Sequence, residues 1–242
     1  MTRFIALVSG KGGTGKTTTT LNLGHSLTKL GKKTILVDAN LTTPNLAIQL
    51  GFMNPEGTIN KFIRKEKNLS EVTYLHESGI SLIPASPSFA EFQKTDPSKL
   101  SELFEHLENM ADFVLIDSPS GLGYEVSQVL KNCDEALIIV NPTLSSMMDS
   151  LKTIQLAKSH DNIISGLVFN LSNKGKYELK KEDIENLLGY PIVGEIRTDK
   201  KIRKALNKQA PLTYLYPFSR SARQYKKVAE HLCLEPKVEL HD

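Results

Sequence analysis

Eight consecutive residues near the amino terminus, residues 10–17, combine four glycines with two lysines and two threonines. Glycines let a loop curl so that several backbone N–H groups face one anion, and a following helix adds the partial positive charge of its N-terminus. In that arrangement Lys16 would reach the β- and γ-phosphates of a nucleotide, and the Thr17 hydroxyl would bind Mg²⁺. The pattern therefore predicts a P-loop for a nucleoside triphosphate. The residues expected to contact it here are Gly12, Gly13, Thr14, Gly15, Lys16, Thr17 and Thr18.

The segments on either side of this loop support the prediction. Residues 4–8 form a short apolar run of the kind that makes a buried strand. After the loop, Leu23, Leu27 and Leu30 recur at helical spacing, and Gly31 follows as a helix stop. A glycine loop between a strand and a helix is the context that a P-loop requires.

Two carboxylates follow other predicted strands. Asp38 comes directly after the apolar run 34–37, and Asp117 closes the apolar run 113–116. Ligands of parallel α/β sheets bind at the carboxyl ends of the strands, so both side chains should lie beside the phosphates. We expect Thr17, Asp38 and Asp117 to hold Mg²⁺, with Asp117 usually acting through water.

A second lysine makes the pattern more specific, because Lys11 comes one place after the first glycine. Residues 11–18 resemble the deviant Walker A box of the MinD/ParA family of ATPases, closest to its archaeal-type MinD members. The resemblance implies that Lys11 contacts the nucleotide of a second subunit in an ATP-dependent homodimer. It also implies slow ATP hydrolysis, stimulated by a protein partner, in a nucleotide switch that positions a division site, a cargo or a chromosome.

The chain departs from the family in the loop after Asp38. The family pattern is Asp-x-Asp, whereas this sequence has Asp38 and Asn40. In the family the second Asp helps to orient the attacking water, and Asn can neither carry that charge nor accept a proton. Catalysis would then rest on Lys11, Lys16, Asp38 and Asn40, with the rate in doubt. The alternative is an ATP-locked scaffold or regulatory dimer that scarcely hydrolyses ATP.

Two further positions follow from the resemblance. Residues 117–121 resemble the Asp-x-Pro-Ala-Gly box of the family, with Ser120 in place of Ala, and the Gly121 N–H is predicted to sense the γ-phosphate. Asn170 follows the predicted strand 163–169, where the family reads adenine with a carboxamide that can donate and accept. An ordinary Asn in a strand-end turn is the other interpretation of Asn170.

The length of 242 residues and 40% hydrophobic content suffice for one large core, and we expect a single domain over 1–242 with a short tail at 235–242. The fold class predicted is α/β and doubly wound, with a mainly parallel sheet of seven or eight strands and helices on both faces. Residues 85–97 should form a loop or a broken helix near the dimer face. Ser146 and Asp149 have capping-box spacing, which predicts a helix start at Ser146.

The charge pattern bears on partners and location. The net charge is only +3, but residues 174–227 hold 14 Lys and Arg against six Asp and Glu, which leaves weak nonspecific DNA binding open. No stretch reaches the roughly 18 apolar residues of a membrane span, and the short, Pro-containing tail is no clear membrane-targeting helix. Cys133 and Cys233 are far apart and predict free thiols in a reducing cytoplasm, not an iron–sulfur ligand pair.

Overall fold

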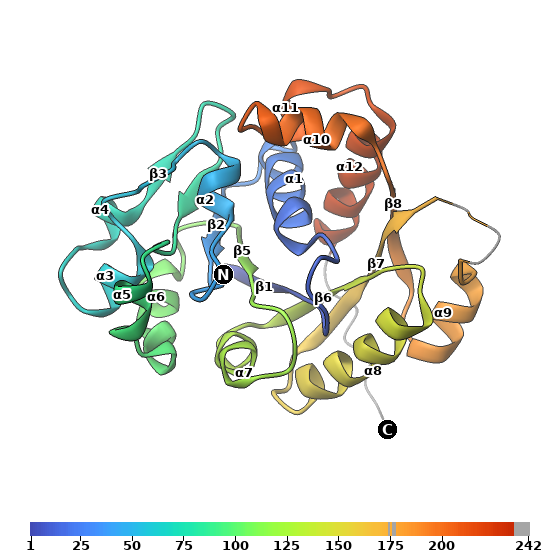
Figure 1. The fold of residues 1–242 in the computed structure, drawn as a ribbon, viewed down its shortest axis with the longest axis horizontal. Coiled ribbons are helices and arrows are strands. Elements are labelled where there is room, and N and C mark those ends of the chain that lie inside the picture. Colours follow the sequence, from blue (N-terminus) through green and yellow to red (C-terminus); the bar gives the residue numbers. More distant parts are fainter. Residues whose placement is uncertain (174, 176–177, 235–242) are drawn as a thin grey trace.

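The computed structural model describes residues 1–173, 175 and 178–234, and an eight-stranded sheet in the order β3-β4-β2-β5-β1-β6-β7-β8 forms its centre (Figure 1). All neighbouring strands are parallel except β3, which pairs antiparallel to β4 at one edge. This sheet confirms the predicted fold class. The strands are β1 (Arg3–Val8), β2 (Thr34–Asp38), β3 (Tyr74–Leu75), β4 (Ser81–Ile83), β5 (Phe113–Asp117), β6 (Glu135–Val140), β7 (Ile163–Ser172) and β8 (Ile192–Arg197).

Helices cover both faces of the sheet, because parallel neighbours need crossover connections. Figure 1 shows α1 and α10–α12 on one side and α7–α9 on the other. The α-helices are α1 (Lys16–Lys29), α2 (Leu46–Gln49), α3 (Ile59–Ile63), α4 (Leu69–Val72), α5 (Phe89–Gln93), α6 (Leu100–Leu107), α7 (Tyr124–Lys131), α8 (Leu144–Lys158), α9 (Lys181–Leu188), α10 (Lys200–Asn207), α11 (Leu212–Leu215) and α12 (Arg220–Leu232). A 3₁₀ turn, η1 (Pro97–Lys99), precedes α6.

The central strand β1 divides the core into two layers. Ile5 and Leu7 pack with the helices on the α1 side, whereas Phe4, Ala6 and Val8 belong to the cluster on the other face. This alternation is the two-residue period of a strand that is buried on both faces. The strand that leads into residues 10–17 is therefore fixed from both sides.

Helix α1 is held close to the sheet. A Cβ atom added at Gly24 would lie 2.5 Å from Leu36 Cδ2 of β2, so only glycine allows this approach. Leu23 and Leu27 are fully buried in the same layer, together with Tyr225 of α12. The helix that begins at the glycine loop is thus positioned by β2 and α12.

Helix α8 begins at Leu144, two residues earlier than the capping-box spacing predicts. The Thr143 side chain caps it by accepting from the Ser146 N–H, and the Ser146 hydroxyl instead accepts from the Asn141 N–H at 2.9 Å. The prediction of a start at Ser146 is therefore wrong, because an earlier residue satisfies the free amide of the first turn.

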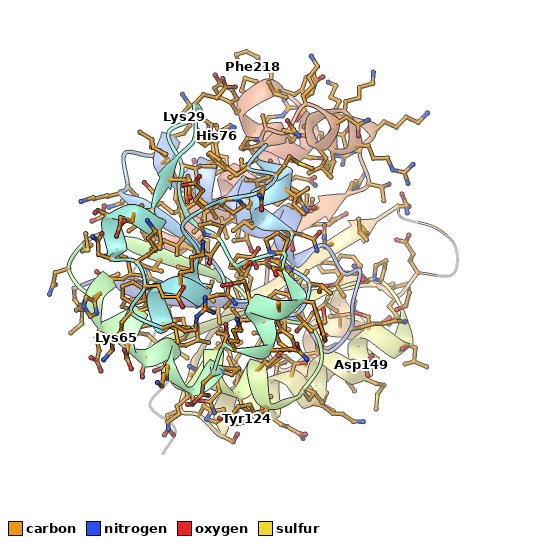
Figure 2. All side chains as sticks on the ribbon, turned by 60° about the vertical axis from the view of Figure 1, so that its left-hand side comes forward. Lys29, Lys65, His76, Tyr124, Asp149 and Phe218 are labelled. Atoms are coloured by element: carbon orange, nitrogen blue, oxygen red, sulfur yellow. The ribbon has the colours of Figure 1, made fainter. Side chains whose placement is uncertain are left out.

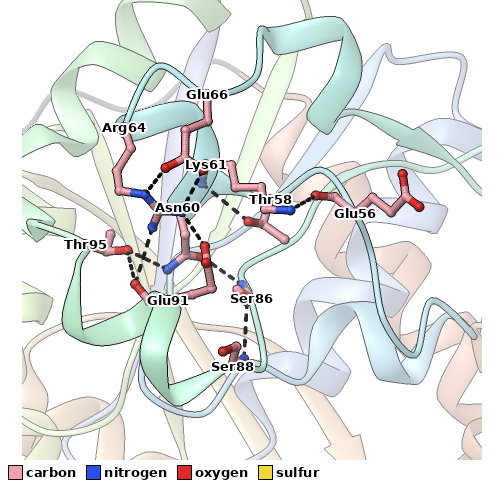
Figure 3. Close-up of polar contacts among 10 residues, drawn as sticks. All are labelled: Glu56, Thr58, Asn60, Lys61, Arg64, Glu66, Ser86, Ser88, Glu91 and Thr95. Carbon is pink, nitrogen blue, oxygen red and sulfur yellow. Dashed lines mark hydrogen bonds and ion pairs between the residues drawn. The ribbon is translucent and has the colours of Figure 1, made fainter.

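A polar cluster holds the segment after β4 against α3 (Figure 3). Arg64 forms ion pairs with Glu66 and Glu91, and the Asn60 side chain donates to Thr95 Oγ1 at 2.9 Å and accepts from the Ser86 N–H at 2.7 Å. As predicted, the segment is a broken helix, made of α5 and η1. These contacts hold the α5–η1 segment in place beside α7.

Some predictions concern residues outside this description. The short tail predicted over 235–242 lies there, as do residues 174, 176 and 177 of the basic segment. Within the ranges that the structure covers, no helix is both long and apolar enough to cross a membrane.

Candidate nucleotide-binding site

The glycine loop connects β1 to α1 at the carboxyl edge of the sheet. Gly13 and Gly15 have φ angles of 76° and 91°, in the left-handed region that glycine adopts without strain. Gly15 is also the N-cap of α1, and no side chain caps the free amides of the first turn. Those N–H groups and the helix dipole are the elements of an anion site.

The Lys16 side chain is buried, with 7% of its surface exposed, and it reaches the second switch, residues 117–121. Its Nζ donates to Ser9 Oγ at 3.0 Å and to Ser120 Oγ at 2.6 Å. Burial lowers the pKa of Lys16, and the nearby carboxylate of Asp117 opposes that shift. A desolvated cation with neutral partners is suited to bind an anionic phosphate.

Asp38 and Asp117 end neighbouring strands and are directly paired in register between β2 and β5. Thr17 Oγ1 donates to Asp117 Oδ2 at 2.6 Å, while the buried Asp117 Oδ1 has no hydrogen-bond partner in the described part of the chain. A hydroxyl and two carboxylates form the hard oxygen donor set that Mg²⁺ prefers. The unpartnered oxygen shows that the residues fit a cation.

The raised pKa values of the two carboxylates also favour a cation site. Burial raises the pKa of Asp117 to about 6, although hydrogen bonding to Thr17 and the charge of Lys16 oppose the shift. Burial and then the charge of Asp117 raise the pKa of Asp38 well above its ordinary value. Two buried like charges that share only the one nearby cation of Lys16 favour binding of a divalent cation.

Asp38 also organises the first switch, residues 38–46. Its carboxylate accepts from the backbone N–H groups of Asn40, Asn45 and Leu46 at 3.2, 3.1 and 3.0 Å. Asn40 turns its own side chain toward Thr43, donating to the carbonyl at 2.9 Å and accepting from the N–H at 3.2 Å. Asp38 therefore lies in the site, whereas the Asn40 carboxamide forms hydrogen bonds to Thr43 within the first switch.

The second switch is anchored to β1. The Ser118 hydroxyl donates to the Leu7 carbonyl at 2.7 Å, and the Gly121 N–H donates to the Ser9 carbonyl at 3.1 Å. The N–H that was predicted to sense the γ-phosphate is therefore engaged within the chain, and its sensing role stays a prediction. Ser120 is the residue of this switch whose side chain contacts Lys16.

Asn170 lies near the carboxyl end of β7 and contacts the P-loop. Its side chain donates to the Thr14 carbonyl at 2.7 Å, and a Cβ atom at Gly15 would lie 2.3 Å from Asn170 Nδ2. Asn141, which the sequence analysis missed, donates to the same carbonyl at 3.3 Å and to the Asn170 carbonyl at 3.0 Å. Its position directly after the strand 135–140 was the available signal. Base recognition by Asn170 stays a prediction.

The remaining loop residues differ in exposure. Lys11, Gly12 and Gly13 form the exposed rim, whereas Thr14 is buried and donates to Ser9 Oγ at 2.9 Å. Thr18 is half-buried, and its carbonyl accepts from Asn22 Nδ2 at 2.8 Å. The two lysines of the loop thus have opposite environments, one buried in the site and one at its rim.

A cavity of about 530 Å³ opens beside the second switch, between the α5–η1 segment and the start of α7. Phe92 and Thr95 line one wall, and Pro119, Ser120 and Glu125 line the other. The cavity therefore adjoins the residue that contacts Lys16.

Comparisons with known proteins agree with this geometry. The model of the CobQ/CobB/MinD/ParA nucleotide-binding domain matches residues 5–212. The chain is 33% identical to an uncharacterised ATP-binding protein of Methanocaldococcus jannaschii, over 94% of this chain and 86% of the relative. It is 31% identical to the septum site-determining protein MinD of Synechocystis, over 96% of this chain and 90% of that protein.

Solved structures give the same result. MinD of Pyrococcus horikoshii complexed with Mg-ADP matches with a TM-score of 0.92 and 31% identity, covering 96% of both chains. The cell division ATPase MinD of Pyrococcus furiosus matches with a TM-score of 0.91 and 33% identity, covering 96% of this chain and 98% of that one. With the P-loop, the paired carboxylates and the sheet order already in place, these likenesses assign the chain to the MinD/ParA family of P-loop ATPases.

Proposed function

We propose that this protein binds Mg-ATP at residues 10–17, dimerises on ATP and hydrolyses it slowly, as a nucleotide switch in spatial organisation within the cell. The observation that carries the proposal is the contrast between the two lysines of the loop. Lys16 is buried beside Asp117, whereas Lys11 is exposed at the rim, and its ammonium has no partner among the described residues. One cation is placed for the bound phosphates and the other is free to reach a second subunit.

Each group has a defined task in this proposal. The α1 amides and Lys16 bind the phosphates, and Thr17 with Asp117 and Asp38 holds Mg²⁺, which would neutralise charge that develops on the phosphoryl group. Lys11 supplies a further cation from the partner copy, so catalysis is mainly electrostatic positioning. A solved MinC:MinD complex from Aquifex aeolicus, whose MinD is similar to this chain, supports the proposal of a protein partner.

Removing Lys11 tests the dimer directly. We expect the wild type to elute as a dimer in size-exclusion chromatography with Mg-ATP and as a monomer with ADP or without nucleotide. Lys11→Ala should stay monomeric in all three conditions while it still binds ATP, because Lys16 and the loop amides remain. Lys65→Ala is the matched control, because this exposed lysine lies far from the glycine loop. Asp149 marks the loop in Figure 2, since a Cβ atom at Gly10 would lie 2.7 Å from Asp149 Cβ, and Lys65 lies away from it. A wild type that is monomeric with ATP would contradict the proposal.

Phosphate release from an Asn40→Asp variant distinguishes the slow ATPase from the ATP-locked scaffold. Asn40→Asp restores a group that can orient water and accept a proton, effects that are worth roughly 10²–10⁴ in rate when the geometry is right. For a slow ATPase we expect measurable phosphate release from the wild type and about a tenfold gain in the variant. Release only from Asn40→Asp would favour the scaffold. Thr42→Ser, on the same loop, is the control for general disturbance of the first switch.

The segment predicted to bind DNA, residues 174–227, includes α10 and α12 with their flanks. Their exposed basic residues are Lys200, Lys201, Arg203, Lys204, Lys208, Arg220, Arg223, Lys226 and Lys227. The fully solvated Phe218, 91% exposed, marks this end of the molecule, opposite Tyr124 in Figure 2. We place weak, salt-sensitive DNA binding on this face beside the nucleotide switch, not in its place.

A further inference from the structure

Ser120 is the residue of the second switch whose hydroxyl contacts the buried Lys16. Its hydroxyl accepts from Lys16 Nζ at 2.6 Å, which is the shorter of the two hydrogen bonds of that ammonium. A hydroxyl can accept and donate at once. Among the residues that the structure describes, no acceptor takes the Ser120 proton, so it is available to a ligand.

The neighbouring donor of the same switch is already used. The Gly121 N–H donates to the Ser9 carbonyl at 3.1 Å, which ties this residue to the end of β1. Ser118 is likewise bound to Leu7 through its hydroxyl. Ser120 is therefore the group of this switch that combines a free proton with a position beside Lys16.

Ser120 belongs to a different segment from the amides of the glycine loop. Those amides are on the backbone that leads into α1, whereas Ser120 follows the end of β5 and reaches the site at the Lys16 ammonium. A Cβ atom at the exposed Gly12 would be 3.9 Å from Ser120 Oγ, which puts the hydroxyl at the rim of the loop. A phosphate has several terminal oxygens, so one can accept from Lys16 while another accepts from Ser120.

We propose that the Ser120 hydroxyl is a ligand of the terminal phosphate, and that it makes this chain prefer nucleoside triphosphate to diphosphate. This inference rests on the proposed function, because it requires a nucleotide at residues 10–17. The preference would come from a side chain of the second switch and not from the backbone of the glycine loop. It also gives the second switch a contact that exists only when the third phosphate is present.

A simpler role would be to hold the Lys16 side chain. Lys16 is expected to contact inner and terminal phosphates alike, so a group that acts only through Lys16 changes the affinity for both nucleotides by a similar factor. A direct ligand of the terminal phosphate changes the affinity for the triphosphate alone. The ratio of the two affinities therefore separates the two roles.

The test is isothermal titration calorimetry with Mg-ADP and with the non-hydrolysable analogue Mg-AMP-PNP. For Ser120→Ala we expect about a tenfold loss of affinity for AMP-PNP and less than about a twofold change for ADP, as for one hydrogen bond to a charged group. Ser120→Thr keeps the hydroxyl and should restore the ratio. Ser101→Ala, a half-buried serine of α6, is the matched control and should leave it unchanged.

The titrations are repeated at two protein concentrations that differ tenfold. A contribution of dimerisation would show as an apparent affinity that depends on protein concentration. Thermal unfolding without nucleotide checks that each variant is folded, as the exposure of Ser120 leads us to expect. A ratio unchanged in Ser120→Ala, or parallel changes for both nucleotides, would overturn this inference and leave the proposed function standing. A wild type that binds neither nucleotide would overturn both.

Discussion

Lys16→Ala is expected to lower the affinity for ATP by at least about a hundredfold. The ammonium is buried, and in the proposal it donates to phosphate oxygens in place of the Ser9 and Ser120 hydroxyls. Two lost hydrogen bonds to charged groups, at roughly 1.5–3 kcal/mol each, correspond to that factor or more. Equilibrium binding of a fluorescent ATP analogue, competed with unlabelled ATP, measures it.

The same variant should fold as well as the wild type. Lys16 is desolvated and its hydrogen-bond partners are neutral hydroxyls, so its removal relieves the cost of a buried charge, which offsets the loss of its attraction to Asp117. We expect an unchanged or higher free energy of unfolding in urea. Lys32→Ala, outside the site, is the control for the general loss of a lysine. ATP affinity within a few-fold of the wild type would refute the assignment of Lys16.

Asp117→Asn is expected to stabilise the metal-free protein and to abolish its response to Mg²⁺. The folded pKa of Asp117, about 6, lies above the value of roughly 3.9 for an unfolded aspartate. The folded state thus binds more protons, and the stabilisation by this protonated group is complete below about pH 4 and is lost as the pH rises through 6. At pH 7 the variant should gain on the order of 3 kcal/mol, from two pKa units at about 1.36 kcal/mol each.

Urea unfolding of both proteins between pH 4 and pH 7.5, in EDTA, measures this gain. The difference between variant and wild type removes the contribution of other groups, such as His25, whose pKa burial lowers to about 4. We expect a small difference at pH 4 that grows toward pH 7, and a rise in melting temperature with Mg-ADP in the wild type only. Asp161→Asn, at an exposed residue, should match the wild type. A gain that does not vary with pH would contradict the carboxylate account.

The parts of the site that local sequence determines could be predicted. Asp38 and Asp117 each follow an apolar strand, and parallel strands bring their carboxyl ends to one edge, so their pairing followed from the pattern. Lys16 and Thr17 are fixed by the spacing of the glycines and by α1. The number and direction of most strands followed for the same reason, because buried parallel strands are short continuous apolar runs.

The rest depends on contacts between distant segments. Asn141 reaches Thr14 only because β6 lies beside β1, an order that no local pattern contains. Helix α7 was not predicted, since it has eight residues and no side-chain cap at Gly123. The fixed position of α5 depends on Arg64 and Glu91, which are 27 residues apart. Such pairings become visible only when the chain is folded.

One hydrogen bond joins the first switch to the cavity beside α7. Thr42 Oγ1 of the first switch donates to Glu125 Oε2 at 2.9 Å, and Glu125 also lines the cavity beside α7. A molecule that entered this cavity and bound Glu125 Oε2 would compete with the threonine, and a rearranged first switch would in turn leave this oxygen free for a ligand. If the two events exclude each other at Oε2, each must weaken the other by the same factor.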